Sequence, residues 1–387
     1  MPAALAELFV LDFSRILAGP LATMLLGDYG ATVIKVERPG TGDDTRAWGP
    51  PYDPAGTATY FLSVNRNKRS IALDLGDPGE LEIARALAAR ADVVVENFRP
   101  GVMDRLGLGY EQLGDAHPGL VYCSITGFGA GEGARMPGYD LLVQALGGLM
   151  SITGSPHSEP QKVGVALVDV VAGLFAATGI LAALRHRDAT GEGQRIEVDL
   201  LSSVLAGLVN QASAYTAGGV VPRRMGNAHP SIAPYELFAT ADGDLVLAVG
   251  NDRQFGDLCR VLDARELADD PRFATNDARV ANRDELRPLL ERRLRGAPAA
   301  DWLEPLLEAG VPAGRVNDVE GAFSLAARLG LDPIAELGAG EGRVRLARNP
   351  VRMSATPPRY GAPPPRLGEL TASKALELIG DAERRAQ

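Results

Sequence analysis

The sequence predicts an α/β protein, with a parallel sheet covered by helices and a smaller α+β domain. Short β-rich segments alternate with helical ones through about the first 200 residues, which is typical of parallel sheets. From about Val220 the pattern changes to a hairpin followed by helices rich in arginine and glutamate. The composition, 46% hydrophobic and 23% charged over 387 residues, is that of an ordinary globular chain.

The first half of the chain supplies the strands of the predicted sheet. The apolar segment at residues 8–13 has the length of a buried strand. Further strands are expected at residues 32–36, 70–73, 93–95, 120–124 and 195–198. Helices are expected at residues 20–29, 77–90, 139–149, 170–186 and 200–217. The segment from Asp77 to Glu80 has the form of a capping box, with proline at the first helical position.

The second part of the chain begins with a β-hairpin. Two β-rich segments, at residues 235–238 and 245–249, flank Asp242-Gly243, a dipeptide typical of tight hairpin turns. Helical segments follow to about Leu307. Proline and glycine then accumulate from residue 338 to 367, which indicates an irregular connection, and a short helix is expected at residues 372–379.

Charge, cysteine content and missing motifs narrow the function. A net charge of -10 argues against bulk binding to nucleic acid or to an anionic membrane. Two cysteines support neither a disulfide framework nor a zinc site. The first residues lack the basic segment of a signal peptide, so we expect a cytoplasmic enzyme. No P-loop, zinc-protease or serine-hydrolase motif occurs, and no dinucleotide-binding motif follows the first strand.

One apolar segment, at residues 165–184, is long enough to suggest a membrane helix. It contains Asp169, whose charge would be costly in lipid, and no second such segment occurs. We therefore expect a short strand or loop followed by a buried helix of a soluble domain, with Asp169 just before the helix.

Several motifs, in order along nearly the whole chain, resemble those of one enzyme family. They are LDFSRILAGP at residues 11–20, VIKVERPG at 33–40, NRNKRSI at 65–71, VENFRPG at 95–101, GYD at 138–140 and RV at 315–316. Together they resemble the class III CoA transferases, the carnitine and formyl-CoA transferase family. Each motif alone is weak, and the ordered set carries the resemblance.

The resemblance implies a more specific fold. It implies a Rossmann-like, CoA-binding large domain at residues 1–215 and a small α+β domain inserted at residues 216–325. The return connection at residues 326–387 would complete the large domain. Two subunits of this family thread through each other, so the resemblance also implies an interlocked homodimer.

Asp169 is the residue that the resemblance assigns as the catalytic nucleophile. It would attack the thioester of a donor acyl-CoA and pass through a mixed anhydride and an aspartyl-CoA thioester. This chemistry implies no metal and no permanently bound cofactor, with coenzyme A (CoA) entering as part of the substrate. From the residues alone, a structural N-cap at the start of an apolar helix is the commoner role for such an aspartate.

Seven residues are candidates for binding CoA. Arginine can stack on adenine or form paired hydrogen bonds with phosphate, and Leu17 and Ala18 would line the pantetheine and thioester end. The others are Arg38, Lys68, Asn97, Phe98 and Arg105. For Arg38 and Lys68 the alternative is a solvated surface charge. Formyl-CoA transferases carry Gln at the position of Leu17, which disfavours an oxalate or formate substrate.

Three further residues are expected to orient the substrate. Tyr139 would donate a hydrogen bond and Asp140 would orient neighbouring groups, or the pair is a buried tyrosine and an N-cap. His229 would meet a substrate carboxylate, or it is a surface-loop histidine. The glycine run of formyl-CoA transferases is missing near residues 226–230. This favours succinyl-CoA as donor and a small dicarboxylic acid as acceptor.

Two other functions are compatible with the sequence. An α-methylacyl-CoA racemase needs an acid–base pair beside the α-carbon, and racemases of this fold carry His-Asp where Tyr139-Asp140 stands. Their Gly-Ala-Pro-Phe-Tyr segment is also replaced here by Ile232-Ala233-Pro234-Tyr235. A non-catalytic CoA-binding protein is the third possibility, and retention of Asp169 argues against it.

Overall fold

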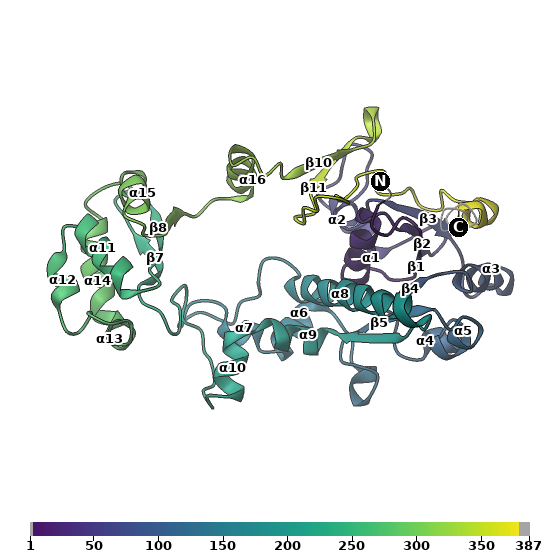
Figure 1. Cartoon of the computed structure of the whole chain (residues 1–387), viewed down its shortest axis with the longest axis horizontal. Helices are drawn as coiled ribbons and strands as arrows, with labels where there is room; N and C mark the ends of the chain where they lie inside the picture. The colour runs from purple at the N-terminus through teal and green to yellow at the C-terminus, as the bar shows by residue number, and fades with distance from the viewer. Residues whose placement is uncertain (1–2, 379–387) are drawn as a thin grey trace. The chain divides into compact units, whose positions relative to one another are not determined.

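The computed structural model describes residues 3–378, which form two compact units (Figure 1). Of these residues, the first unit contains 3–149, 163–219 and 331–378, and the second contains Met150–Lys162 and Val220–Gly330. Residues 150–162, which the sequence suggests belong to the large domain, thus belong to the second unit. The reason is local: the Gly226 N–H donates to the Gly154 carbonyl at 3.0 Å, and Arg224 Nε donates to the Ser155 carbonyl at 3.3 Å.

A six-stranded parallel sheet forms the centre of the first unit. Its strand order is β3-β2-β1-β4-β5-β6. The strands are β1 (Phe9–Asp12), β2 (Thr32–Glu37), β3 (Lys68–Ala72), β4 (Val93–Glu96), β5 (Val121–Thr126) and β6 (Arg195–Asp199). The direction of strand order reverses between β1 and β4. In sheets of this kind, ligands bind outside the carboxyl ends of the strands at such a reversal.

Helices cover both faces of this sheet because successive strand residues point to opposite sides. One face, with Val10 of β1, packs against α1 (Ala18–Asp28), α8 (Leu167–Thr190) and α9 (Leu200–Gly207). The other face, with Phe9 and Leu11, packs against α3 (Pro78–Ala88), α4 (Val102–Arg105) and α5 (Tyr110–Ala116). The prediction of a parallel sheet with helices on both faces is therefore confirmed.

The C-terminal part of the chain returns to the first unit. The Leu370 N–H donates to the Ser70 carbonyl at 2.9 Å, and Leu370 and Ala375 are buried in the core beside β3. Residues 372–378 are helical, and residue 379, the end of the expected helix, lies outside the described residues. An antiparallel ribbon of β10 (Ile334–Leu337) and β11 (Val344–Ala347), which the sequence did not indicate, precedes this segment.

The second unit has its own sheet and core. The predicted hairpin is present as β7 (Tyr235–Ala239) and β8 (Asp244–Ala248), and β9 (Ala313–Arg315) pairs antiparallel with β8. Its helices after the hairpin are α11 (Asp252–Val261), α12 (Arg265–Asp269), α13 (Asn276–Ala281), α14 (Arg283–Leu294), α15 (Ala299–Glu308) and α16 (Val319–Arg328). The short helix α7 (Leu149–Ile152) crosses the boundary between the two units in the sequence.

Several helices differ in detail from the expected ones. The helix expected at 139–149 is α6 (Asp140–Leu146) followed by the separate α7, and the one expected at 200–217 is interrupted after α9. There Val209 has a φ of 43°, and α10 (Asn210–Thr216) begins anew. Only half of the predicted capping box forms: Asp77 accepts hydrogen bonds from Gly79 and Glu80, but the Glu80 side chain turns to the Asp74 N–H.

α8 is the one helix in the described part of the chain that is long and apolar enough to cross a bilayer. Half of its apolar window is buried inside the structure, and Ala172, Ala176 and Ile180 lie in the core against the sheet. The core helix of a soluble protein can have the same length and apolar composition as a membrane-spanning helix. The opposite side of the helix leaves Leu174 and Phe175 exposed.

Candidate active site

A cleft of about 680 Å³ lies at the carboxyl ends of the strands of the first unit. Its walls come from the loops after β1, β4 and β5 and from the beginnings of α6 and α8. These loops include Arg15–Ala18, Asn97–Pro100 and Ile125–Gly129. The cleft therefore occupies the place where the reversal of strand order predicts a ligand.

Asp169 lines this cleft with its carboxylate almost fully buried. It is the third residue of α8, whose N-cap is Ala166, so the expectation that Asp169 precedes the helix as its N-cap is wrong. Within residues 3–378 the carboxylate accepts no hydrogen bond from a protein donor. Burial, followed by the nearby Asp140 carboxylate, raises the pKa of Asp169 to about 7. An unpaired carboxylate in a cleft, with its pKa raised, is typical of a reactive group.

Asp140 is the residue that caps α8. Its Oδ1 accepts the Val168 N–H at 2.8 Å and the Asp169 N–H at 3.3 Å, so it satisfies the start of the helix that carries Asp169. Its Oδ2 accepts a hydrogen bond from Gln144 Nε2 at 2.6 Å. Gln144, a buried residue that sequence reasoning missed, also accepts the Val163 N–H. Asp140 thus orients Asp169 through the helix backbone and raises its pKa through its charge.

The beginning of α1 faces the same cleft. Leu17 is the N-cap of α1 and Ala18 its first residue; both are buried and line the cleft. No side chain caps this helix, so its first N–H groups are available to a ligand. α1 lies very close to α8, because a Cβ placed on Gly173 would be 2.7 Å from the Ala18 carbonyl oxygen. The cleft therefore combines the Asp169 carboxylate with a helix N-terminus that favours negative charge.

Phe98 and Asn97 lie on the loop after β4 and have different roles. Phe98 lines the cleft, and the Arg15 guanidinium lies 5.7 Å from the centre of its ring. The Asn97 side chain is instead occupied by protein: Oδ1 accepts the Arg15 N–H at 2.9 Å and Nδ2 donates to the Arg15 carbonyl at 2.7 Å. Asn97 therefore holds the loop after β1 in place.

A smaller cavity of about 170 Å³ adjoins the cleft, since Arg15 and Phe98 line both. Arg38 is exposed and lines this cavity together with Leu73 and Leu75. A cation beside apolar side chains suits a purine ring and its phosphates. Arg105, also a candidate for CoA, is exposed on α4 and does not line either cavity.

Lys68 does not reach a ligand in this structure. It is fully buried, and its ammonium group donates to Asp12 Oδ2 at 3.0 Å, to the Pro20 carbonyl at 2.9 Å and to Asn65 Oδ1 at 3.0 Å. These three contacts use all three donors of a lysine. The expectation that Lys68 either contacts CoA or lies on the surface is therefore corrected: it is part of a buried charge network.

The remaining expected site residues lie in different places. Tyr139 is the N-cap of α6 and lines the cleft, but it is 62% exposed and so is not the buried tyrosine of the alternative interpretation. His229 belongs to the second unit, where its ring centre lies 5.3 Å from that of Tyr235 and its Nδ1 accepts the Ser231 N–H.

Tyr60 is a neighbour of Asp169 that sequence reasoning missed. Burial, followed by the charges of Asp169 and Asp140, raises the pKa of its phenol. It lies on the short helix α2 (Thr59–Ser63) and packs edge-to-face against Trp48, which lines the cleft. No pattern in the sequence signals this position, because α2 has a single turn.

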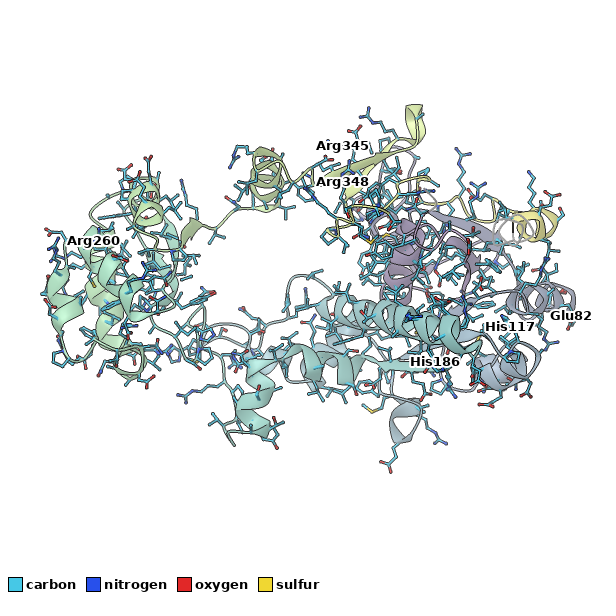
Figure 2. The ribbon with its side chains drawn as sticks, viewed as in Figure 1. Glu82, His117, His186, Arg260, Arg345 and Arg348 are labelled. Atoms are coloured by element: carbon cyan, nitrogen blue, oxygen red, sulfur yellow. The ribbon has the colours of Figure 1, made fainter. Side chains whose placement is uncertain are left out.

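Histidines do not line the cleft of the first unit. Figure 2 labels two of them, His117 after α5 and His186 near the end of α8. Seventeen residues of helix separate His186 from Asp169, which corresponds to roughly 25 Å. His117 precedes the amino end of β5, at the edge away from the cleft. In the first unit, an acid–base pair that includes histidine is thus not available for racemization. Within the described residues, no cluster of three or more potential metal ligands occurs.

Comparison with known proteins identifies the family of the chain. The sequence profile of CoA-transferase family III matches residues 5–371. The chain is 48% identical to a succinyl-CoA:glutarate CoA-transferase of Mus musculus over 318 residues, 82% of this chain and 73% of that protein. It is 43% identical to an acetyl-CoA:oxalate CoA-transferase of Acetobacter aceti over 346 residues, 89% of this chain and 87% of that protein.

Solved structures support the same assignment. A CAIB/BAIF family protein from Brucella suis superposes with a TM-score of 0.86 and 45% sequence identity, covering 98% of this chain and 100% of that one. The structural similarity and the sequence profile each cover most of the chain, and both indicate the same family. The chain belongs to CoA-transferase family III and is an enzyme that transfers coenzyme A between an acyl-CoA and a carboxylic acid.

Proposed function

We propose that this enzyme moves CoA from succinyl-CoA to a small dicarboxylic acid, with Asp169 as the nucleophile. The observation that carries the mechanism is the Asp169 carboxylate, which is almost fully buried in the cleft and has no protein donor in the described residues. A buried charge without a partner is costly, so such a group is kept for a reason other than stability.

The reaction proceeds through two kinds of covalent intermediate. Asp169 attacks the thioester carbonyl, the C–S bond breaks, and CoA leaves as a thiolate that needs no proton. The thiolate then attacks the Asp169 acyl carbon of the mixed anhydride and releases the donor acid. The acceptor carboxylate attacks the resulting aspartyl-CoA thioester, and CoA returns to the acceptor acyl carbon. Each step exchanges one bond for another, and no net proton is taken up or released.

The beginning of α1 supplies the stabilising dipole in this proposal. Each attack places negative charge on a carbonyl oxygen, and the α1 N-terminus, which no side chain caps, meets the cleft at Leu17 and Ala18. Donors that are already oriented before the reaction stabilise such an oxyanion most effectively. The close packing of α1 on α8 at Gly173 keeps the donors and the nucleophile in a fixed relation.

CoA itself would lie along the two adjoining cavities. Its thioester end faces Asp169, Leu17 and Ala18, and its nucleotide end lies at the smaller cavity beside Arg38 and Phe98. Arg105 stays a candidate for a phosphate contact at the surface of α4. Tyr139 and His229 stay candidates for the acceptor acid.

Relatives and sequence differences support the choice of acids. A succinyl-CoA:glutarate CoA-transferase shares 48% of aligned residues, and the chain has Leu17 where formyl-CoA transferases have glutamine. The experiment is a screen of succinyl-CoA, acetyl-CoA and formyl-CoA against glutarate, mesaconate, oxalate and acetate. The highest kcat/KM should belong to succinyl-CoA with glutarate or mesaconate, the two C5 dicarboxylates of the panel. A preference for oxalate with formyl-CoA or acetyl-CoA would contradict the substrate assignment and leave the mechanism standing.

We also propose that the enzyme is a soluble cytoplasmic homodimer. Large apolar side chains are exposed on one side of α8 and on α9, namely Leu174, Phe175, Leu181 and Leu205. Exposed large apolar side chains that gather on neighbouring helices are typical of an interface. Because the other side of α8 is buried against the sheet, a second copy covers this face better than a bilayer would. Sedimentation without detergent should give twice the mass of the chain, and a Phe175→Asp change should lower it. A monomer in buffer that binds lipid vesicles would contradict the proposal.

A further inference from the structure

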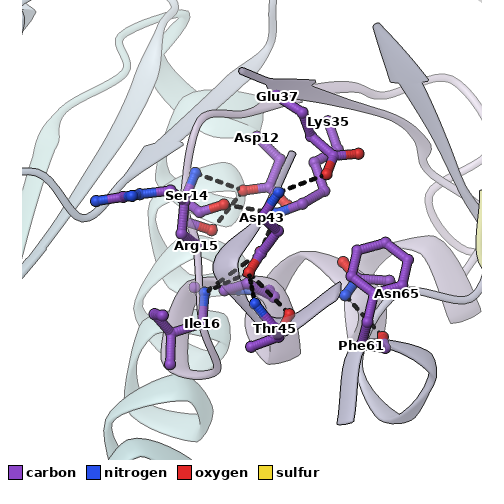
Figure 3. A network of polar contacts seen from close by, with 12 residues as sticks. Asp12, Ser14, Arg15, Ile16, Lys35, Glu37, Asp43, Thr45, Phe61 and Asn65 are labelled. Atoms are coloured by element: carbon purple, nitrogen blue, oxygen red, sulfur yellow. Dashed lines mark hydrogen bonds and ion pairs between the residues drawn. The ribbon is translucent and has the colours of Figure 1, made fainter. Parts of the chain in front are cut away.

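The loop between β1 and α1 is held by side chains that lie in the core. The Lys35 ammonium donates to the Ser14 carbonyl at 2.7 Å, and the Asp43 carboxylate accepts the Ile16 N–H at 3.3 Å (Figure 3). Lys35 and Asp43 also form an ion pair of 2.9 Å. A single buried pair therefore binds the backbone on both sides of Arg15.

The remaining polar groups of this loop are bound as well. Asp12 accepts the Ser14 N–H at 2.9 Å, and the amide of Asn97 binds both backbone groups of Arg15. Five successive backbone groups, from the Ser14 N–H to the Ile16 N–H, thus have side-chain partners. An ordinary surface loop is bound to water instead. The number of these contacts indicates that the position of this loop matters.

The charges that hold the loop are deeply buried. Lys35 has no exposed surface and Asp43 has 1%. The free energy needed to remove two charges from water is about as large as the electrostatic attraction gained between them, so a buried ion pair is weak evidence for stability. Lys35 is also one of only four lysines in the chain. A role in fixing geometry explains the pair better than a role in stability.

The loop contains strained backbone directly beside the cleft. Ile16 has a φ of 72°, which is rare for a β-branched residue. Such a conformation persists only where the surroundings enforce it. The Asp43 carboxylate binds the N–H of this residue, and the next residues, Leu17 and Ala18, line the Asp169 cleft at the beginning of α1.

From these contacts we propose that Asp43 and Lys35 are positioning residues for catalysis: they fix the β1–α1 loop and so set the place of the α1 N-terminus relative to Asp169. This inference rests on the proposed covalent mechanism. Neither residue lines the main cleft that holds Asp169, and Asp43 lines only the smaller cavity, so each affects the reacting groups through the loop. Their loss should slow the chemical step by a larger factor than it weakens CoA binding, because the Asp43 carboxylate is bound to Lys35, Thr45 and the Ile16 N–H and is 1% exposed.

The first test is Asp43→Asn, compared with Asp28→Asn as a matched control. Asp28 forms a buried ion pair with Arg66 at 2.6 Å at the opposite end of α1. Its change to asparagine therefore also removes a buried charge from an ion pair, but away from the loop. Both variants should lower the thermal midpoint. Only Asp43→Asn should lower kcat, by about a hundredfold, as expected for misplacement by about 1 Å, and this loss should exceed any change in KM for acyl-CoA.

A milder pair of variants keeps the test decisive if Asp43→Asn does not fold. Thr45 donates from both its N–H and its hydroxyl to Asp43 Oδ1, at 3.0 and 2.8 Å. Thr45→Val removes the hydroxyl and retains both buried charges, whereas Thr45→Ser retains the hydroxyl. We expect Thr45→Val to lower kcat by roughly tenfold and Thr45→Ser to stay near wild type, as the loss of one hydrogen bond to a charged group implies.

The readout is the single-turnover rate at which succinyl-CoA and hydroxylamine modify Asp169. Slow modification in Asp43→Asn and Thr45→Val, with normal rates in Asp28→Asn and Thr45→Ser, supports the inference. Equal rates in all folded variants, or an equal loss in Asp28→Asn, overturns it. If wild-type enzyme itself shows no modification at Asp169, the covalent mechanism fails, and the two failures are thereby distinguished.

Discussion

The charge of Asp140 should set the pH at which the enzyme becomes active. Asp169 must be a carboxylate to attack, and its pKa of about 7 comes first from burial and then from Asp140. In wild type, kcat/KM should therefore fall as the pH drops below about 7. Asp140→Asn removes the like charge and retains an oxygen that can accept the Val168 N–H. Its acid limb should move to lower pH by roughly one unit, or about 1.4 kcal/mol.

The size of this effect is measurable. Activity that follows the carboxylate fraction would be about a tenth of its plateau at pH 6 in wild type and about half in Asp140→Asn. The plateau itself should be lower in the variant, because a less basic carboxylate is a weaker nucleophile. The assay is the initial rate of CoA transfer between pH 5 and 9, with acyl-CoA well below KM so that the free enzyme is reported.

Gln144→Met is the control for the structural part of this change. It removes the hydrogen bond from Gln144 to Asp140 Oδ2 and leaves the Asp140 charge in place. Its acid limb should stay at the wild-type pH. If Asp140→Asn leaves the limb unchanged, or if Gln144→Met moves it equally, then the neighbouring charge does not control Asp169.

Three further changes test other parts of the account. Asp169→Asn should raise the free energy of unfolding by up to roughly 4 kcal/mol above pH 7 and by little below pH 4. The reason is that a raised carboxyl pKa destabilises the folded state only at a pH where the group ionises. Urea unfolding at both pH values measures this difference. Gly173→Ala should lower the free energy of unfolding by about 1–3 kcal/mol and remove most activity, because its Cβ would lie 2.7 Å from the Ala18 oxygen. In the control Gly256→Ala the new Cβ has no atom within 4 Å, so stability should be unchanged or higher. Thermal melts of both variants measure this. Arg38→Ala should raise KM for acyl-CoA by about tenfold with kcat nearly unchanged, as seen in initial-rate kinetics, if Arg38 binds the nucleotide end.

Most of the first unit follows from local sequence pattern. Each strand of the parallel sheet is a short apolar segment between turn residues, and a parallel strand buried on both faces has no other pattern to show. The strand boundaries are therefore predicted to within two residues. The place of Asp169 in the cleft was implied by the ordered motifs.

The roles of individual polar residues were harder to predict, because they depend on contacts between distant segments. Lys68 looks like a surface or ligand-binding lysine until the loop before β3 brings it beside Asp12, 56 residues earlier. Asp140 begins one helix but caps another, 28 residues later. Sequence alone also gave no sign that residues 150–162 join the second unit, since this depends on pairing with residues 224–226.

The most direct test of the central claim is to trap and locate the covalent intermediate. Wild-type enzyme and Asp169→Ala are mixed with succinyl-CoA and then hydroxylamine, and the modified peptide is mapped by mass spectrometry. The account predicts a hydroxamate on Asp169 in wild type and no modification of that peptide in the variant. A wild-type enzyme that transfers CoA with no modification at Asp169, or an Asp169→Ala variant that retains full transfer activity, would contradict it.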